Sequence, residues 1–286
     1  MSLDQQSIIR AFNRVAQSYQ KAAFFQEEVA SRTFERLNYM NIKPAKILDV
    51  GCATGYCSRE LKKTYKKAEV FGVDIAPQMI VEAKQSQGLF KKVQYQVADA
   101  NHLPFEDNQF DIVFSNLLLP WLADLQVTFK EWNRVLRPGG LLMFSTLGVD
   151  TLTELKQAWQ QVDQNIHVNA FMDMHDVGDQ VFNAGFENVV LDRDMITLTY
   201  QTLKGLMKDI KSVGAQNHHH NRHKGLTGKN KLQVLEKIYD TMRWESGELP
   251  VTCEVVYGHA WKKAGKPQGD YHTYDVSLSG ANSKGK

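Results

Sequence analysis

Three aspartates recur at even spacing, each beside a short apolar run. Asp49, Asp74 and Asp99 stand at or directly after the ends of segments that read as β-strands. Those segments are residues 46–50, 69–73 and 93–98. Because ligands of open parallel α/β sheets bind at the carboxyl ends of the strands, we expect the three carboxylates to border one ligand site. The alternative is that each Asp only caps a helix, but the equal spacing on strand ends favours the ligand site.

The turn after the first strand brings backbone close to that site. Residues 49–55 read Asp-Val-Gly-Cys-Ala-Thr-Gly, with glycines that let a ligand approach the main chain. This spacing is neither the Gly-x-Gly-x-x-Gly of dinucleotide-binding turns nor the Gly-Lys-Ser/Thr of a P-loop. A carboxylate here would repel a pyrophosphate but suits the ammonium and sulfonium of S-adenosylmethionine (SAM). On this interpretation Asp74 accepts from both ribose hydroxyls, and Asp99 with Ala100 faces the adenine amine.

Residues 46–146 as a whole resemble the core of class I SAM-dependent methyltransferases. The resemblance implies a Rossmann-like α/β fold, a doubly wound, mostly parallel seven-stranded sheet with an antiparallel edge strand. One departure is Ala53, where the family usually has Gly, and we expect this residue to keep a negative φ and a small side chain. The motif segments are residues 49–55, 73–79, 98–105, 110–115 and 136–140. The expected cofactor-binding residues are Asp49, Gly51, Cys52, Gly55, Asp74, Ile75, Met79, Asp99, Ala100 and Asn116.

Strands alternate with helices from residue 46 to 146, which predicts a parallel sheet. We expect an N-terminal helical lid in residues 1–40, a methyltransferase domain in 41–262 and a disordered tail in 263–286. Apolar residues at helical spacing indicate amphipathic helices there. Residues 12–19 with Ala22 and Gln26 resemble a lid motif of small-molecule methyltransferases, which implies a lid that excludes water from the site, and the alternative is a helix packed in the core. Within the domain, a helical insertion at 200–250 separates two long final strands. Further elements are expected as helices 55–65, 77–87, 121–136, 151–163, 174–184, 202–213 and 230–244, and as antiparallel strands 189–199 and 251–261.

Composition excludes several classes of function. The 286 residues include 43% hydrophobic side chains and 34 basic against 32 acidic residues, and the net charge of +2 implies no attraction to nucleic acid. The chain has no run of about 18 apolar residues and a polar N-terminus, so we expect neither a membrane span nor a signal peptide. The three cysteines lack metal-ligand spacing and indicate reduced thiols in a cytoplasmic protein.

Residues 204–231, here called the basic segment, concentrate positive charge in a nearly neutral chain. They hold seven Lys or Arg and four His, and Asp209 is their single acid. A solvated face is the ordinary interpretation of such a run, and a dock for an acidic partner is the functional one. The histidines lack neighbouring Cys or acidic ligands, so we expect no metal site.

The C-terminal half resembles the malonyl-[acyl-carrier protein] O-methyltransferases of biotin synthesis. The resemblance implies methyl transfer to the free carboxylate of a malonyl thioester, with the acidic malonyl-acyl-carrier protein as partner. A mitochondrial complex I assembly factor credited with arginine hydroxylation shares the block at 150–155. A methyltransferase of a free small acid or quinone and a non-catalytic SAM-binding assembly factor are therefore the alternatives. The segments that carry the resemblance are residues 12–19, 146–155, 206–215, 225–228 and 249–261.

Four residues are expected to act on the acceptor. A malonyl carboxylate titrates near about 4, so it needs alignment and dehydration rather than a general base. Arg243 or Lys211, on the two insertion helices, would orient it. Tyr19 would contact the cofactor or the acceptor from the lid, and Trp121 would line the acceptor pocket. The alternatives are a surface charge for Arg243 and a core position for Trp121.

Overall fold

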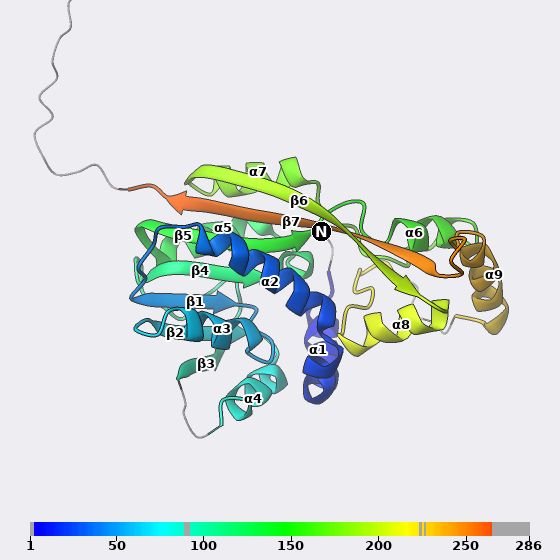
Figure 1. Cartoon of the computed structure of the whole chain (residues 1–286), viewed down its shortest axis with the longest axis horizontal. Helices are drawn as coiled ribbons and strands as arrows, with labels where there is room; N and C mark the ends of the chain where they lie inside the picture. The colour runs from blue at the N-terminus through cyan, green and yellow to red at the C-terminus, as the bar shows by residue number, and fades with distance from the viewer. Residues whose placement is uncertain (1–2, 89–91, 223–224, 226, 265–286) are drawn as a thin grey trace, which may run out of the picture.

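The computed structural model describes residues 3–88, 92–222, 225 and 227–264. Its centre is a seven-stranded sheet in the order β3-β2-β1-β4-β5-β7-β6 (Figure 1). Pairing is parallel from β3 to β5, whereas β7 runs antiparallel to both β5 and β6. This confirms the predicted doubly wound sheet, with the antiparallel strand one position in from the edge. The strands are β1 (Lys46–Val50), β2 (Glu69–Asp74), β3 (Val93–Val97), β4 (Phe110–Asn116), β5 (Leu136–Leu147), β6 (Phe186–Tyr200) and β7 (Leu249–Lys262).

Helices cover both faces of this sheet and extend beyond its end (Figure 1). Two of them, α1 and α2, precede the first strand and are here called the lid. The predicted tail lies outside the described residues from 265 onward. The helices are α1 (Gln5–Ala22), α2 (Phe24–Asn38), α3 (Tyr56–Thr64), α4 (Pro77–Gln85), α5 (Leu125–Val135), α6 (Thr153–Gln160), α7 (Met174–Asn183), α8 (Leu203–Ser212) and α9 (Lys229–Asp240).

The predicted helices differ from the observed ones by a few residues at their ends, and two of these differences affect the site. Asp124 caps α5 by accepting a hydrogen bond from the Val127 N–H at 3.1 Å, so the helix expected from residue 121 begins after Asp124. Trp121 instead ends a short 3₁₀ turn. The second insertion helix ends at Asp240 rather than at 244, which leaves Arg243 in the turn that follows.

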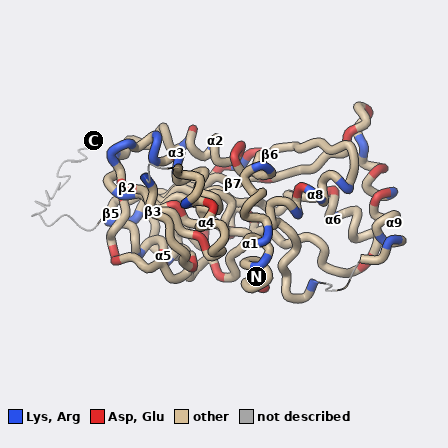
Figure 2. The backbone as a smooth tube through the Cα atoms, turned by 90° about the horizontal axis from the view of Figure 1, so that it is seen from below, with Lys and Arg blue, Asp and Glu red and all other residues tan. Residues whose placement is uncertain are grey.

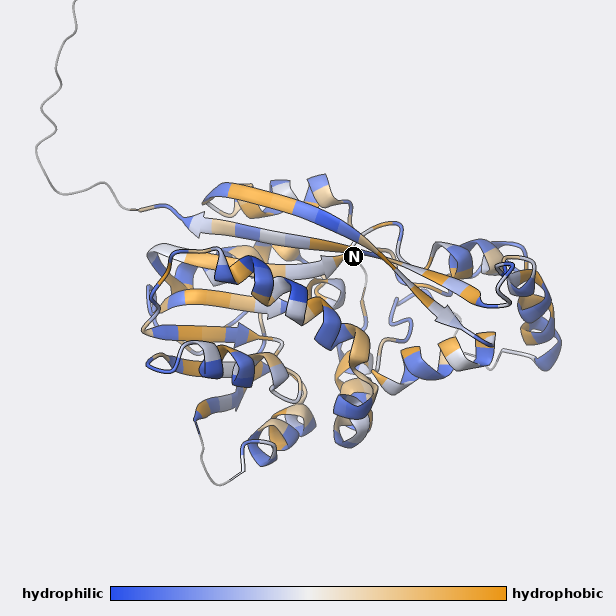
Figure 3. Ribbon diagram, viewed as in Figure 1, coloured by the Kyte–Doolittle hydropathy of each residue, from blue (hydrophilic) through white to orange (hydrophobic). Residues whose placement is uncertain are grey.

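The sheet has a hydrophobic cluster on each face, and hydrophobic residues, coloured orange, recur along its strands (Figure 3). On one face, Phe129 and Trp132 of α5 and Val181 of α7 pack against the strands. On the other, Leu37 of α2 and Leu61 of α3 belong to a second cluster. Each of these side chains is nearly or wholly buried, and burial of one large apolar side chain contributes about 1.5–3 kcal/mol. The strands are therefore held firmly on both faces, and their carboxyl ends form a rigid base for a site.

The last two strands run past the rest of the sheet and carry a second lobe. Pairing of β5 with β7 stops at Leu147 and Val255, whereas pairing of β6 with β7 continues to Tyr200 and Leu249. Helices α6, α8 and α9 pack on this extension, here called the second lobe (Figure 1). Tyr239 of α9 is fully buried there and donates to the Pro250 carbonyl oxygen at 2.9 Å. The predicted insertion thus contributes α8 and α9 to a lobe beside the sheet.

Candidate active site

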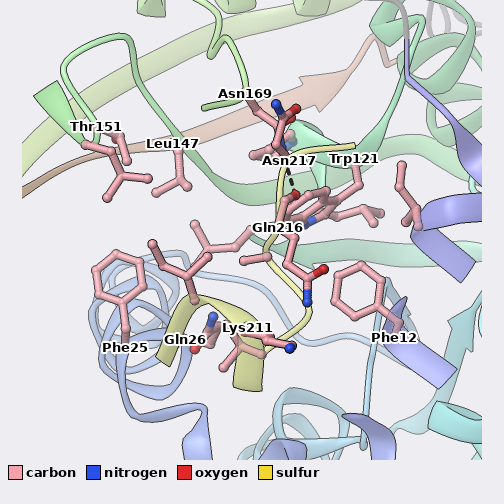
Figure 4. Close-up of a pocket in the computed structure, with 18 of the residues that line it drawn as sticks. Phe12, Phe25, Gln26, Trp121, Leu147, Thr151, Asn169, Lys211, Gln216 and Asn217 are labelled. Carbon is pink, nitrogen blue, oxygen red and sulfur yellow. Dashed lines mark hydrogen bonds between the residues drawn. The ribbon is translucent and has the colours of Figure 1, made fainter. Parts of the chain in front are cut away.

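A cavity of about 440 Å³ lies where the carboxyl ends of the strands meet the lid and the second lobe. Asp74 and Asp99 contribute from the strand ends and Tyr19 from α1. Trp121 and Lys211 contribute from further along the chain (Figure 4). Apolar side chains form most of the remaining wall, as is typical of sites for small molecules. The fold therefore gathers residues from distant parts of the chain around one space.

The turn between β1 and α3 has a left-handed backbone at three residues. Gly51 and Gly55 have φ of 75° and 81°, and Ala53 between them has φ of 45°. The expectation that Ala53 keeps a negative φ is therefore wrong. This conformation costs a residue with a Cβ atom roughly 1–2 kcal/mol, and the hydrogen bond from its N–H to Asp74 Oδ2 (3.0 Å) offsets part of that cost. Gly51 is also constrained by space, since an added Cβ would lie 2.9 Å from Leu118.

Asp74 joins two loops through one carboxylate and still lines the cavity. It accepts hydrogen bonds from the backbone N–H groups of Ala53 (3.0 Å) and Ala76 (2.8 Å). Burial raises its pKa to about 6, against the lowering effect of these two bonds. A carboxylate has about four lone-pair sites, so acceptor capacity remains for a ligand. Two neighbouring hydroxyls, such as those of a ribose, fit this requirement.

Asp99 and Asn116 connect the strand ends to the lid. Asp99 accepts from Gln5 Nε2 of α1 at 3.0 Å, and Asn116 donates to the Gln26 carbonyl oxygen of α2 at 3.0 Å. Both residues line the cavity. The lid is therefore fixed to the same residues that border the expected cofactor site. The other expected cofactor-binding residues in this wall are Gly51, Ile75 and Ala100.

Four of the expected cofactor contacts do not line the cavity, namely Asp49, Cys52, Gly55 and Met79. Asp49 is 1% exposed and accepts from Ser58 Oγ at 2.5 Å, and burial raises its pKa to about 7. Its carboxylate thus lies behind the cavity wall, and its contact with a cationic ligand stays a prediction. Gly55 and Cys52 shape the turn through their backbone, and Met79 is fully buried beneath the lid.

Tyr19, Trp121 and Lys211 border the cavity at the lid and the second lobe. Burial raises the pKa of the Tyr19 hydroxyl well above its usual value, and the Asp74 charge adds to the rise. The Trp121 ring meets the Phe12 ring edge-on, with the centroids 5.5 Å apart. Lys211 has no ion pair or side-chain hydrogen bond to any described residue. Its ammonium is therefore available to an anion in the cavity.

Arg243 lies outside the cavity wall. Its guanidinium donates to the carbonyl oxygens of Gln201 (3.2 Å) and Gly247 (2.5 Å) and pairs with Asp240. These contacts close the turn after α9. They correct the expectation that Arg243 sits on the second insertion helix and orients the acceptor, because its donors are already engaged.

Four amide side chains of the cavity wall are not among the site residues predicted from the sequence. Gln26, Asn169, Gln216 and Asn217 all line the cavity (Figure 4). Asn169 donates to the Gln216 carbonyl oxygen at 3.4 Å, while the buried Gln26 Oε1 has no partner among the described residues. Buried acceptors are normally paired, so this oxygen can accept a hydrogen bond from a water molecule or a ligand in the cavity. Isolated Asn and Gln residues carry no spacing signal, and only the fold brings these four together.

The basic segment is partly engaged within the protein. Lys231 pairs with Asp163 at 2.7 Å, and Arg222 pairs with Asp4 at 3.5 Å. His218 is buried. Figure 2 shows the remaining positive residues of this segment on α8 and α9, and another positive group at the opposite end, near α3. The exposed lysines of the segment without an ion pair to a described residue are Lys204, Lys208, Lys229 and Lys211, of which Lys211 also lines the cavity.

Two further predictions concern metals and membranes. The described residues contain no cluster of His, Cys, Asp or Glu placed to hold a metal ion. The three cysteines are free and buried. His223 and Lys224 of the basic segment lie outside the described residues. Within the described parts of the chain, no helix has both the length and the apolar character needed to span a membrane.

The chain is similar to known proteins in both sequence and fold. A methyltransferase domain family matches residues 48–144. The chain is 44% identical over 268 residues to a malonyl-[acyl-carrier protein] O-methyltransferase of Gallionella capsiferriformans, covering 92% of each chain. A protein of the same name from Legionella pneumophila is 42% identical over 257 residues, covering 90% of each. Phosphoethanolamine N-methyltransferase 2 of Haemonchus contortus, solved in complex with SAM, shares the fold with a TM-score of 0.56 at 16% identity, over 88% of this chain and 57% of that one.

The position of Asp74 predicts both a loss of affinity and a pH dependence. Asp74→Ala should weaken SAM binding at least about 100-fold, because hydrogen bonds to a charged group contribute about 1.5–3 kcal/mol each. In the wild type, the ionised Asp74 carboxylate accepts hydrogen bonds from the ribose hydroxyls better than the protonated carboxyl does. Affinity should therefore be constant above the pKa of about 6 and fall about tenfold per pH unit below it. Calorimetry across this range measures both effects.

Asp111 provides a matched control for this variant. It is buried and accepts from the backbone N–H groups of Ala45 and Lys46, both at 2.7 Å, but it does not line the cavity. Asp111→Ala should lower stability and leave SAM affinity unchanged. Equal SAM affinity in folded Asp74→Ala and wild type would contradict the assignment.

Proposed function

The chain belongs to the malonyl-[acyl-carrier protein] O-methyltransferase family, and we propose that it transfers a methyl group from SAM to the free carboxylate of a malonyl thioester on acyl-carrier protein. The product is a malonyl methyl ester, a starting unit for biotin synthesis. One observation carries the proposal: a single cavity holds the strand-end carboxylates of Asp74 and Asp99 and the ammonium of Lys211, which has no ion pair to a described residue. The first two suit the nucleoside of SAM, and the third suits an acceptor carboxylate.

The residues around the cavity suit a reaction without a general base. When bound, SAM supplies an electrophilic methyl group on its sulfonium. A malonyl carboxylate is already ionised at neutral pH, since carboxyls titrate near about 4. Tyr19 keeps its proton because its pKa is raised, and so does the Cys253 thiol, whose pKa burial raises to about 12. The chain therefore contributes orientation and exclusion of water, for which the lid and the apolar rings of Phe12 and Trp121 are placed.

Lys211 is the residue that we assign to the acceptor carboxylate. It extends from α8 into the same wall as Trp121 and Gln216 (Figure 4). An ammonium without a protein partner can form a charge-assisted hydrogen bond with a carboxylate, and such bonds are stronger than neutral ones. Gln26 Oε1 and the amides of Asn169 and Gln216 can serve the polar groups of the pantetheine arm.

The reaction itself predicts a specific product. Malonyl-acyl-carrier protein incubated with the protein and SAM should gain one methyl group, removable by mild alkali because it is an ester. Mass spectrometry of the carrier measures this, with malonyl-coenzyme A and free malonate as parallel acceptors. We expect the carrier-linked acceptor to react best. A carbon-methylated product, or activity with free malonate alone, would contradict the proposal.

Substitutions distinguish Lys211 from Arg243 as the residue that binds the acceptor carboxylate. Lys211→Met should raise the KM for malonyl-acyl-carrier protein about tenfold or more, from the loss of one charged hydrogen bond of about 1.5–3 kcal/mol. Its SAM affinity should stay unchanged, and Lys211→Arg should recover part of the loss. Arg243→Met, the matched control, should leave the KM unaltered. The opposite pattern, with the change in Arg243→Met, would transfer the role to that residue.

We further propose that the exposed part of the basic segment docks the acidic carrier protein. Lys204, Lys208 and Lys229 have no ion pair to a described residue, and the neighbouring residues Met207 and Lys211 line the cavity. A carrier bound along this segment would therefore lie beside the cavity into which its arm must reach. Exposed charge pairs contribute only about 0–1 kcal/mol each, so their effect belongs mainly to the association rate.

Charge reversal tests this dock. Replacing Lys204, Lys208 and Lys229 together by Glu should lower kcat/KM for the carrier-linked substrate about tenfold or more at low salt, because steering depends on the local potential. Neither kcat nor SAM affinity should change. Added salt should lower kcat/KM in the wild type and have little effect in the variant.

The opposite end of the molecule offers a control with the same change in net charge. Lys43, Lys66 and Lys67 are exposed there, and their joint replacement by Glu should have a much smaller effect. Equal losses in the two triple variants would indicate a general effect of net charge. Such a result would place the dock elsewhere.

A further inference from the structure

His218 is buried where the lid, the second lobe and the cavity wall meet. It is 2% exposed, and its ring meets the Trp121 ring edge-on with the centroids 5.9 Å apart. Nδ1 lies 3.0 Å from Ser7 Oγ of α1, and Nε2 lies 3.3 Å from the Gly214 carbonyl oxygen after α8. The His218 backbone N–H donates to Asn169 Oδ1 at 3.1 Å. This single residue therefore contacts α1, the end of α8, Asn169 and Trp121.

The partners of the ring assign its tautomer. A carbonyl oxygen only accepts hydrogen bonds, so Nε2 carries the proton and donates to Gly214. Nδ1 is then an acceptor, and the Ser7 hydroxyl donates to it. Ser7 Oγ in turn accepts from Arg222 Nη2 at 3.1 Å. The result is a directed chain of hydrogen bonds from Arg222 through Ser7 and His218 to the end of α8.

Backbone and charge contacts reinforce this chain. The Asp4 N–H donates to the His218 carbonyl oxygen at 3.0 Å, and the Arg222 guanidinium pairs with the Asp4 carboxylate at 3.5 Å. Residues 3–7 and 218–222, here called the latch, thus join the start of α1 to the second lobe. Since the lid reaches the cavity through α1, the latch determines where that helix lies.

We propose that His218 is a positioning residue for methyl transfer, which locks α1 over the cavity and holds Trp121 in place in the acceptor wall. Phe12 of α1 meets the same indole edge-on, so the lid and His218 both contact Trp121. The inference rests on the proposed function, because Trp121 meets the acceptor only if this cavity is the methyl-transfer site. A displaced wall would misalign the acceptor, and small misplacements cost large factors in rate.

The hydrogen-bond chain from Arg222 to Gly214 requires a neutral His218 ring. Burial lowers the pKa of His218 from its usual 6.5, and the Arg222 charge also lowers it, while its backbone hydrogen bond and the Asp4 charge act in the opposite direction. Among the described residues, Arg222 and Asp4 are the charged groups that act on the ring. A proton on Nδ1 would end the hydrogen bond from Ser7 and place two cations together. The latch therefore holds at neutral pH and weakens as the pH falls below 6.5.

Tryptophan fluorescence tests this coupling without substrate. An imidazolium beside an indole quenches it, and Trp159, stacked on His167 with the centroids 3.5 Å apart, forms a second such pair. The transition assigned to His218 is therefore the pH-dependent component of the wild-type signal that is lost in Trp121→Phe. Ser7→Ala should move the midpoint to higher pH, because the neutral ring loses its donor. His218→Ala should abolish the transition. The exposed neighbour provides the control, and His220→Gln should leave the transition unchanged.

Hydrogen exchange and kinetics complete the test. Exchange of the α1 amides should accelerate about tenfold or more in Ser7→Ala and in His218→Ala, and stay unchanged in His220→Gln. With saturating SAM and malonyl-acyl-carrier protein, kcat should fall about tenfold or more in His218→Ala while KM changes little. His218→Gln, whose amide can donate toward Gly214, should recover part of kcat. If His218→Ala fails to fold, Ser7→Ala carries the test.

The outcomes separate this inference from the proposed function. A transition that Ser7→Ala does not move, together with unchanged exchange in α1, would overturn the latch whatever the activity. If fluorescence and exchange respond as expected but no methylation of the malonyl carrier occurs in the wild type, the latch stands and the proposed function fails.

Discussion

The carboxylate of Asp74 links the fold of this protein to its site. It holds the N–H groups of Ala53 and Ala76 in two different loops, and it lines the cavity. Without it, the left-handed conformation at Ala53 would lose the hydrogen bond that compensates it. Burial makes the ionised carboxylate costly, as its raised pKa shows. Ligand hydroxyls that donate to it would recover part of that cost, so the burial of Asp74 favours the binding of such a ligand.

A second constraint is the unequal length of the strands. Because β6 and β7 run beyond β5, their ends carry a lobe that faces the strand ends across the cavity. The sheet supplies carboxylates suited to the methyl donor, and the lobe supplies Lys211 and amides suited to an acceptor. The lid bridges the two, through Gln5 to Asp99 and through Ser7 to His218. Donor and acceptor sites are thus built from different parts of the chain but closed by the same helix.

The sequence predicted most of the fold, since alternating strands and helices and the turn at 49–55 leave few other arrangements. It also predicted which strand ends meet. It could not predict side-chain direction: Asp49 lies within β1 and points into the protein, whereas Asp74 is the last residue of β2 and reaches the cavity. Arg243 was misplaced because helix ends depend on local capping. Gln26 and Asn169 were missed because their role arises only from contacts distant in sequence.

The account depends on a single cavity that binds the nucleoside of the methyl donor at Asp74 and the acceptor carboxylate at Lys211. A crystal structure with S-adenosylhomocysteine and a malonyl pantetheine thioester tests this most directly. In that crystal structure, the ribose hydroxyls should lie within about 3.2 Å of the Asp74 carboxylate, and the malonyl carboxylate within about 3.2 Å of Lys211 Nζ. A malonyl carboxylate bound away from Lys211, or a ribose that does not contact Asp74, would contradict it.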